Sequence, residues 1–323
     1  YYASKPVKAQ DYIQEVEASF FKLTNDAKTG SMNSLKACLR ENLKELEDTS
    51  RNAGEMQGLT TGYKKLDELL LGMTPGQLIV LAARPAMGKT ALVLNIAQNA
   101  VRASGLPACI FSLEMLAPEL SMRLLSQCAK VDSKRIRQKN FLDTDLRNIG
   151  RGVQELSKLP IHINDSGETT VLDIQSACRK IKAEEGLGLI VIDYLQLMNS
   201  HTGNPSREQQ ISEISRALKS MAKELECPVI ALSQLNRGVE ARPNKRPMTS
   251  DLRESGAIEQ DADIVMFVYR DEFYNPDTKE PGVAEIIVGK NRAGETGTAK
   301  LTFVGQYTSF ENIAFDPTGA PPA

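Results

Sequence analysis

Residues 78–97 read LIVLAARPAMGKTALVLNIA, and they join an apolar run to a helical pattern through a short loop that contains glycine. The run Leu78–Ala82 is typical of a buried strand, and Leu92, Leu94 and Ile96 belong to the expected helix. A loop between a strand and a helix start aims backbone N–H groups and the positive end of the helix dipole at one point. A phosphate-binding loop requires this setting. The stretch therefore predicts a nucleotide site.

The residues of the loop Ala83–Thr90 have separate tasks. Gly88 lets the backbone approach the phosphates, and Lys89 places a positive charge at the β and γ oxygens. The Thr90 hydroxyl can coordinate Mg²⁺. Ala83 stands where this pattern usually has its first glycine, so a residue with a Cβ must tolerate the turn there. We expect ATP to contact Ala86, Met87, Gly88, Lys89, Thr90 and Ala91.

Short apolar runs alternate with helical patterns from Leu59 onward, and a clean helical stripe extends from Ile211 to Leu225. Most of the runs are continuous, which is typical of strands buried on both faces of a parallel sheet. After Gly282 the pattern predicts an antiparallel hairpin, Val283–Val288 with Ala299–Val304. The predicted fold class is α/β with a mainly parallel sheet. The other expected strands are Leu78–Ala82, Ala108–Phe111, Ile161–Ile163, Leu189–Ile192, Val229–Leu232 and Ile264–Val268.

Three polar residues that follow predicted strands suit a hydrolytic site. Asp193 ends an apolar run, where α/β sheets place their ligands, and can hold Mg²⁺ together with Thr90. Glu114 can polarise the attacking water, and Gln234 can sense the γ-phosphate. Each residue also has a plain structural interpretation, as a strand exit, a solvated glutamate near a helix start, or an exposed amide.

The first fifty residues differ from the rest of the chain. They carry two amphipathic helical stripes, which cannot form a core by themselves and must pack either on this chain's own domain or on a neighbouring subunit. A polar stretch from Glu47 to Gly58 then predicts a linker. We therefore expect a helical linker or subunit-docking segment, residues 1–50, and a nucleotide-binding domain, residues 51–323. The stripes are Ile13, Val16, Phe20, Phe21 and Leu23, and Leu35, Leu39, Leu43 and Leu46.

Composition limits the class of protein. The 323 residues have a formal net charge of −2, so nucleic acid would have to be held by local basic loops rather than by a global field. Five cysteines occur singly and only two histidines are present, which argues against a disulfide framework or a zinc site and fits a reducing cytoplasm. No apolar run approaches a membrane span, and no signal-peptide pattern opens the chain. We expect a cytoplasmic protein without a membrane partner.

Seven motifs follow one another in a fixed order between about Leu59 and Asn312. They are Thr61-Gly62-Tyr63 with Leu66-Asp67, Ala83–Thr90, Phe111–Met115, Ile192–Met198, Leu232–Arg237, Ser250–Gly256 and Gly289–Arg292. In this order they resemble the C-terminal ATPase domain of bacterial replicative DnaB helicases. Several of the motifs are far more specific than a phosphate loop alone.

The resemblance implies a RecA-like P-loop core that assembles as a hexameric ring with ATP between subunits. Gln234 matches the family's γ-phosphate sensor, and Arg123 matches a position close to the nucleotide. Lys290 and Arg292 match the finger that reaches into the next subunit's site, and Asn291 between them is also expected to contact ATP. A cation supplied in trans stabilises the charge of the transition state only when subunits are correctly juxtaposed. From composition alone, the same residues would be a solvated hairpin tip.

For DNA, the resemblance points to the loop that holds the strand's phosphates in the central channel, which Arg253, Glu254 and Gly256 match. An arginine can pair with a phosphate, and a glycine amide can donate to one without obstruction. A basic loop nearby suits contacts to the backbone that do not depend on sequence, although it could also be an ordinary surface loop. Its cations are Arg237, Arg242, Lys245 and Arg246.

The implied function is that of an ATP-dependent replicative helicase, which travels 5′→3′ on single-stranded DNA and unwinds the duplex at the fork. Two alternatives are a RecA-like recombinase and a non-enzymatic, ATP-gated DNA clamp; Glu114, Lys290 and Arg292 argue against the clamp. The expected partners are single-stranded DNA and further copies of the chain, and the resemblance leaves room for a helicase loader. The family's N-terminal domain, which is associated with primase contact, has no counterpart in this chain, so primase contact is not expected of it.

Overall fold

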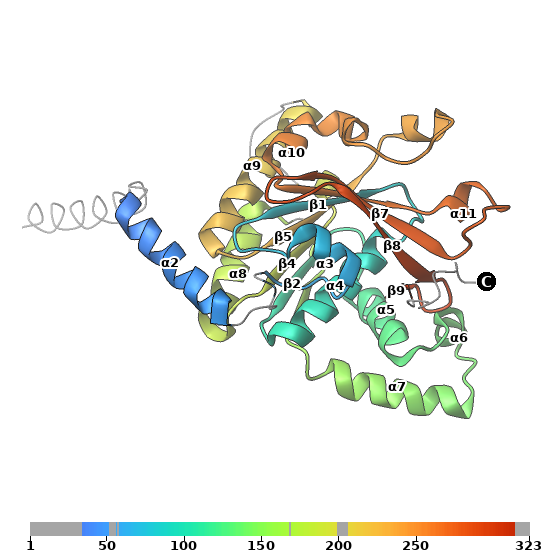
Figure 1. Cartoon of the computed structure of the whole chain (residues 1–323). Helices are drawn as coiled ribbons and strands as arrows, with labels where there is room; N and C mark the ends of the chain where they lie inside the picture. The colour runs from blue at the N-terminus through green and yellow to red at the C-terminus, as the bar shows by residue number, and fades with distance from the viewer. Residues whose placement is uncertain (1–33, 52–55, 57, 168, 199–205, 314–323) are drawn as a thin grey trace, which may run out of the picture. The chain divides into compact units, whose positions relative to one another are not determined.

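The computed structural model describes residues 34–51, 56, 58–167, 169–198 and 206–313 (Figure 1). The chain divides into two compact units, Tyr1–Glu55 and Met56–Ala323. In the first unit, helix α2 (Leu35–Arg51) exposes Leu35, Leu39 and Leu43, which recur every four residues along one face. The earlier helical stripe, from Ile13 to Leu23, lies outside the described residues.

Helix α2 corrects the expected start of the linker. The polar stretch from Glu47 was expected to lie outside the helix, but residues 47–51 continue it. Glutamate and arginine are good helix formers, and the first glycine after Leu46 is Gly54. Polarity without a helix breaker therefore did not mark the boundary.

One nine-stranded sheet runs through the second unit, in the order β3-β2-β4-β5-β1-β6-β7-β8-β9. The pairs from β3 to β6 are parallel, and the pairs from β6 to β9 are antiparallel. The expected α/β fold with a mainly parallel sheet is confirmed, and β9 is an additional strand. The bounds are β1 Leu78–Ala83, β2 Ala108–Ser112, β3 Ile161–Asn164, β4 Leu189–Asp193, β5 Val229–Gln234, β6 Ile264–Tyr269, β7 Val283–Asn291, β8 Gly297–Val304 and β9 Ser309–Asn312.

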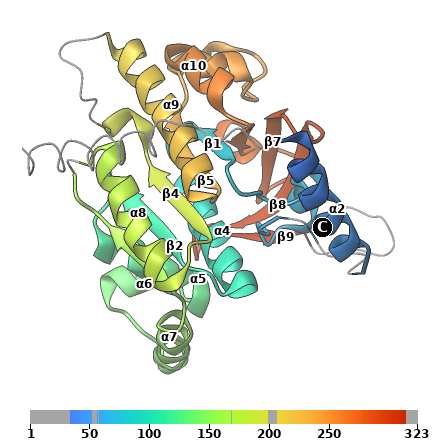
Figure 2. The ribbon, with the colours of Figure 1, turned by 90° about the vertical axis from the view of Figure 1, so that its left-hand side faces the viewer.

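Helices cover both faces of this sheet (Figure 2). Successive strand residues point to opposite faces, so Ile79 and Leu81 of β1 join the core on one side and Leu78 and Val80 join the core on the other. Burial on both faces explains the continuous apolar runs. The first core includes α3 (Lys64–Leu70), α4 (Lys89–Ser104) and α5 (Ala117–Ala129), and the second includes α8 (Val171–Glu185) and α9 (Arg207–Leu225).

The remaining helices are short, apart from α7. They are α6 (Ser133–Gln138), α7 (Asp143–Leu156), α10 (Gly256–Asp261) and α11 (Asp271–Tyr274), with the 3₁₀ helices η1 (Leu195–Leu197), η2 (Arg237–Ala241) and η3 (Thr249–Ser255).

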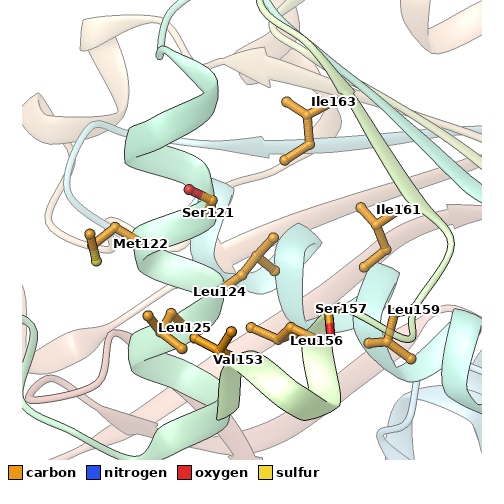
Figure 3. A pocket seen from close by; sticks show the side chains of 10 residues that line it. All are labelled: Ser121, Met122, Leu124, Leu125, Val153, Leu156, Ser157, Leu159, Ile161 and Ile163. Atoms are coloured by element: carbon orange, nitrogen blue, oxygen red, sulfur yellow. The ribbon is translucent and has the colours of Figure 1, made fainter. Parts of the chain in front are cut away.

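Helices α5 and α7 meet β3 around a cavity of about 370 Å³, whose walls are apolar except for Ser121 and Ser157 (Figure 3). None of the residues that line this cavity carries a charge that could pair with phosphate. In the part of the chain that is described, no helix is long and apolar enough to cross a membrane.

The register of the parallel strands brings their carboxyl ends together. Ala83 at the end of β1 lies opposite Gln234 at the end of β5, and Ser112 of β2 lies opposite Asp193 of β4. Ligands of open α/β sheets bind outside this edge. The sheet therefore gathers at one place the residues that follow four different strands.

Candidate nucleotide site

The phosphate loop turns sharply between β1 and α4. Gly88 has φ +98°, and a Cβ there would lie 2.9 Å from Phe310 Cζ, so only glycine fits without displacement. Ala86 has φ +65°, also in the left-handed region. Ala83, in contrast, is the last residue of β1 and is buried with no left-handed backbone. The missing first glycine is tolerated because the turn begins one residue later.

Lys89 and Thr90 converge on one carboxylate. Thr90 Oγ1 donates a hydrogen bond of 2.8 Å to Asp193 Oδ2, and Lys89 Nζ lies 3.7 Å from Asp193 Oδ1. The Lys89 ammonium also lies 4.7 Å from the centre of the Tyr194 ring. The structure therefore brings together the three residues that the sequence assigned to phosphate and metal.

Asp193 has room for one more partner. Its side chain is 2% exposed, yet Oδ1 has no hydrogen-bond donor among the described residues. A buried carboxylate oxygen without a donor is costly unless a cation completes its surroundings. Oxygen ligands from a carboxylate and a hydroxyl, beside nucleotide phosphates, are what Mg²⁺ prefers. The residues present therefore fit this metal.

Burial is the largest influence on the pKa of Lys89. The removal of its side chain from water lowers the pKa of this lysine, while the nearby carboxylates of Asp193 and Glu114 act in the opposite direction. A lysine that is poorly solvated in this way gains most from an added anion. The site is thus prepared for phosphate.

Glu114 lies in the loop after β2, and its side chain is exposed. The loop is tied to the end of β4, because the Leu113 backbone N–H donates to the Asp193 carbonyl at 2.7 Å. The Glu114 carboxylate is close enough to act on the pKa values of both Lys89 and Tyr194 in the upward direction, after the larger effect of burial on each. An exposed carboxylate beside the phosphate loop can reach a water molecule in line with a γ-phosphate.

Gln234 is exposed at the end of β5, and a second amide holds the backbone beneath it. Gln196 Nε2 donates to Ser233 Oγ at 2.9 Å, and its Oε1 accepts from the Gln234 backbone N–H at 3.4 Å. Gln196 lies in the motif that follows Asp193, but sequence reasoning gave it no role. The Gln196 side chain therefore links η1, which follows β4, to the end of β5.

Sequence reasoning also missed Arg84, the second residue of the phosphate loop. Its guanidinium is 9% exposed and donates to Glu240 Oε1 and to the Leu235 carbonyl, each at 2.8 Å. Glu240 belongs to η2, which begins with Arg237. The phosphate loop is therefore anchored to the basic loop within the same subunit.

Among the described residues, no hydrogen bond or ion pair joins the other expected nucleotide-binding residues to this cluster. Arg123 is half-buried on α5. Lys290, Asn291 and Arg292 lie at the end of β7 and just after it, paired with the start of β6. Asn291 Nδ2 donates to the Leu69 carbonyl at 3.1 Å. A role for these residues in the neighbouring subunit's site stays a prediction.

The basic loop is partly neutralised by its own chain. Arg242 pairs with Asp251 at 2.7 Å, and Arg246 forms two bonds to Glu285, of 2.8 and 2.6 Å. Lys245 stacks on Tyr274, with its ammonium 4.7 Å from the ring centre. Arg237 alone of the four is exposed without a hydrogen-bond partner in the described part of the chain. The backbone of η3 carries Arg253 and Glu254, and Gly256 opens α10.

The family model of the DnaB-like helicase C terminal domain matches residues 58–312. The replicative DNA helicase DnaC of Bacillus subtilis (strain 168) is 42% identical over 318 residues, which are 98% of this chain and 70% of that protein. The chain belongs to the DnaB-like helicase family. Relatives at this level of identity are replicative DNA helicases, and this chain is such an enzyme, driven by the hydrolysis of a nucleotide. The recombinase and clamp alternatives are set aside.

Solved structures agree with this assignment. One of them, an isolated ATPase domain, has a TM-score of 0.84 and 38% identity, and the match covers 88% of this chain and all of that one. A DnaB-like replicative helicase, solved in a study of its interactions with primase, has a TM-score of 0.80 and 36% identity, covering 94% of this chain and 72% of that one. The RecA-like core expected for this DnaB-like helicase is confirmed.

Proposed function

We propose that this helicase hydrolyses Mg²⁺–ATP between subunits of a hexameric ring and thereby moves along single-stranded DNA. The observation that carries the nucleotide part is the meeting of Lys89, Thr90 and Asp193 beneath the phosphate loop. A Mg²⁺ ion bound there supplies neutralisation of phosphate charge and orientation of the γ-phosphate.

Within one subunit, the residues divide the work of hydrolysis. The backbone of the phosphate loop and Lys89 bind the β and γ oxygens. Glu114, exposed at the same edge, orients water and accepts its proton at the carboxylate. Gln234, whose backbone is held by Gln196, senses the γ-phosphate. Arg123, on α5, also contacts the nucleotide.

The neighbouring subunit completes the site. Lys290 and Arg292, with Asn291 between them, reach the γ-phosphate of the next subunit and stabilise transition-state charge. This proposal is supported by the charges within a single subunit, where Lys89 has the one ammonium group that lies beside Asp193 in the described part of the chain. Hydrolysis would then occur only in an assembled ring.

Single-stranded DNA passes through the ring and is held by its phosphates. Arg253, Glu254 and Gly256 of η3 and α10 form the main contact, with Arg237 as a free cation nearby. Arg242, Lys245 and Arg246 shape the basic loop through their internal contacts and add positive charge to it. Travel is 5′→3′, as the family resemblance implies.

The same proposal covers partners, domains and location. The chain assembles with further copies of itself and works in the cytoplasm on DNA at the replication fork, with a helicase loader as a further partner. Residues 1–50 serve as linker and subunit-docking segment, and residues 51–323 serve as motor. Primase contact is not assigned to either segment.

The first test compares ATP hydrolysis by the wild type and by Glu114→Ala, with and without single-stranded DNA, beside unwinding of a forked duplex. We expect DNA-stimulated turnover in the wild type and a loss of about 10²-fold or more in the variant. Glu184→Ala, which removes an exposed glutamate from α8, is the matched control and should behave as the wild type. Absence of turnover in a folded, assembled wild type would contradict the proposal.

A second test addresses the finger. Glu114→Ala subunits lack a working site but keep their finger, and Arg292→Ala subunits have the opposite defect. Mixed rings should recover part of the ATPase activity that neither variant shows alone. Lack of recovery, with mixed assembly verified by native mass spectrometry, would place both residues in the same site.

A further inference from the structure

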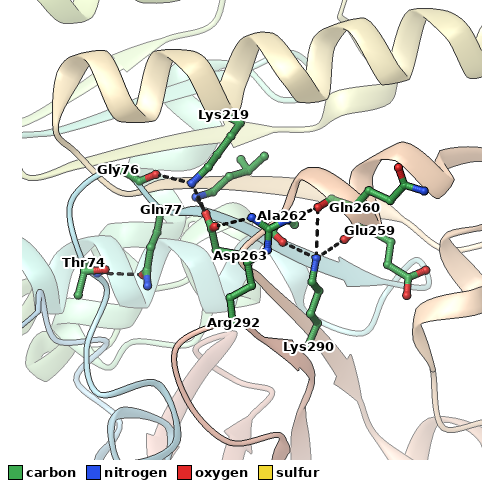
Figure 4. A network of polar contacts seen from close by, with 11 residues as sticks. Thr74, Gly76, Gln77, Lys219, Glu259, Gln260, Ala262, Asp263, Lys290 and Arg292 are labelled. Atoms are coloured by element: carbon green, nitrogen blue, oxygen red, sulfur yellow. Dashed lines mark hydrogen bonds and ion pairs between the residues drawn. The ribbon is translucent and has the colours of Figure 1, made fainter. Parts of the chain in front are cut away.

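The two finger cations are bound by their own chain at the carboxyl end of α10 (Figure 4). Lys290 Nζ donates to the backbone carbonyls of Glu259 and of Ala262, the latter at 2.7 Å. The Arg292 guanidinium donates to the carbonyl of Gln260. The last carbonyls of a helix lack partners within the helix, and cations satisfy them well. The end of α10 is therefore a dock for the finger.

Asp263 completes this dock from the start of β6. Its side chain is nearly buried, and Oδ1 lies 3.4 Å from the Arg292 guanidinium. Oδ2 accepts from Lys219 Nζ at 2.6 Å and from the Leu78 backbone N–H at 2.8 Å. Two cations thus share one carboxylate, so removal of one leaves its negative charge to the other.

The dock is continuous with the DNA loop. Helix η3, with Arg253, ends at Ser255, and α10 begins at Gly256 without an intervening residue. Because α10 has six residues, the carbonyls that hold the finger lie at most about 9 Å along the axis from the loop. A displacement of the loop therefore moves the acceptors of Lys290 and Arg292.

We propose that Asp263 is a positioning residue for the finger: it holds Arg292 on its own chain until DNA occupies the loop. Occupation shifts α10, weakens the dock and lets the finger reach the neighbouring site. This inference rests on the proposed trans role of Arg292. It adds a link inside one subunit, from DNA to the finger, that makes hydrolysis respond to DNA.

Two substitutions should act in opposite directions. Asp263→Asn removes the charge that holds Arg292 but leaves an oxygen that can accept from Leu78, so the finger becomes available without DNA. Lys219→Gln removes the competing cation, so Asp263 holds Arg292 more tightly. A purely structural pair would lower thermal stability in both variants and leave the DNA response alone.

The experiment places each substitution in subunits whose own site is inactive. Finger donors carry Glu114→Ala alone or with Asp263→Asn or Lys219→Gln, and acceptors carry Arg292→Ala. The measured quantity is the DNA stimulation, which is the ratio of ATPase rates of the mixed rings with and without single-stranded DNA. Asp145→Asn in the donor is the control, because Asp145 is similarly buried and pairs with Arg135 at 2.8 Å.

We expect Asp263→Asn to lower the DNA stimulation about fivefold by raising the DNA-free rate, the effect of losing one ion pair whose arginine is 51% exposed. Lys219→Gln should raise the stimulation, and Asp145→Asn should leave it unchanged. Unchanged stimulation in the first two, or changes of the same sign, would overturn the inference while trans catalysis stands. If the donors with Asp263 intact restore no activity, the trans role itself fails, and the inference fails with it. If Asp263→Asn subunits do not assemble, the sign of the Lys219→Gln effect decides alone.

Discussion

Replacement of Thr90 by valine should destabilise the nucleotide-free protein as well as impair hydrolysis. Valine keeps the branched shape of threonine but loses the hydroxyl that donates to Asp193 Oδ2 at 2.8 Å. The Asp193 side chain is 2% exposed, and its other oxygen already lacks a donor within the described residues. The variant therefore leaves a buried carboxylate with Lys89, at 3.7 Å, as its nearest charged partner.

The size of the effect follows from these contacts. A hydrogen bond to a charged group contributes about 1.5–3 kcal/mol to stability, and a buried charge left without it costs the upper part of that range. Thr90 is only half-buried and Lys89 can move closer, so we expect a loss of about 2 kcal/mol. For a unit of this size, that corresponds to a fall in melting temperature of about 5 °C.

Thermal unfolding without nucleotide measures this directly, with Thr90→Ser as the matched control because serine keeps the hydroxyl. The serine variant should melt much closer to the wild type than the valine variant does. The double variant Thr90→Val with Asp193→Asn should recover part of the loss, since the orphaned charge is gone. If Thr90→Val and Thr90→Ser melt at the same temperature, the hydroxyl does not stabilise Asp193 and the reasoning is wrong.

Three further predictions concern other parts of the site. Burial lowers the pKa of Lys89 below its ordinary value of 10.5, so the folded state binds fewer protons there than the unfolded state does. The wild type should therefore gain stability relative to Lys89→Met as the pH rises toward 10.5. Thermal melts across that pH range measure this difference. Glu240→Gln deprives the nearly buried Arg84 of its charged partner. Because Glu240 is 43% exposed, we expect ATP binding to weaken by about 1 kcal/mol, which is a roughly fivefold rise in KM for ATP with kcat retained. An unchanged KM would refute the anchoring role. Arg237→Ala should reduce the salt dependence of single-stranded DNA binding by about 0.7 in log–log slope, whereas Arg246→Ala, which breaks an ion pair, should mainly lower the melting temperature.

The local parts of the site could be predicted from consecutive residues. The phosphate loop, its flanking strand and helix, and the carboxylate at the end of β4 each produce a pattern within about ten residues. Even the departure at Ala83 could be noticed, although only the backbone showed that this residue still belongs to β1. The linker was placed too early because the break in polarity at Glu47 is not a break in the helix.

Contacts between distant segments could not be predicted in the same way. Thr90 and Asp193 are 103 positions apart, and their meeting depends on a strand order in which β4 and β1 both flank β5. The ion pairs of Arg242 and Arg246 likewise depend on which acidic residue the fold brings near. Charge in the sequence indicated a basic loop but not how much of its charge is already paired.

The sequence by itself determined the phosphate loop, the alternation of buried strands with helices and the family of this DnaB-like helicase, because burial and backbone hydrogen bonding impose periodicities that consecutive residues display. Only the tertiary structure decided that Asp193 lacks a donor, that Arg84 fastens the phosphate loop to η2 and that Asp263 and α10 hold the finger. These features are side-chain contacts between segments that are distant in the sequence and that the strand order brings together. A one-dimensional pattern carries no record of them, since the same residues would read identically if the strands were arranged differently.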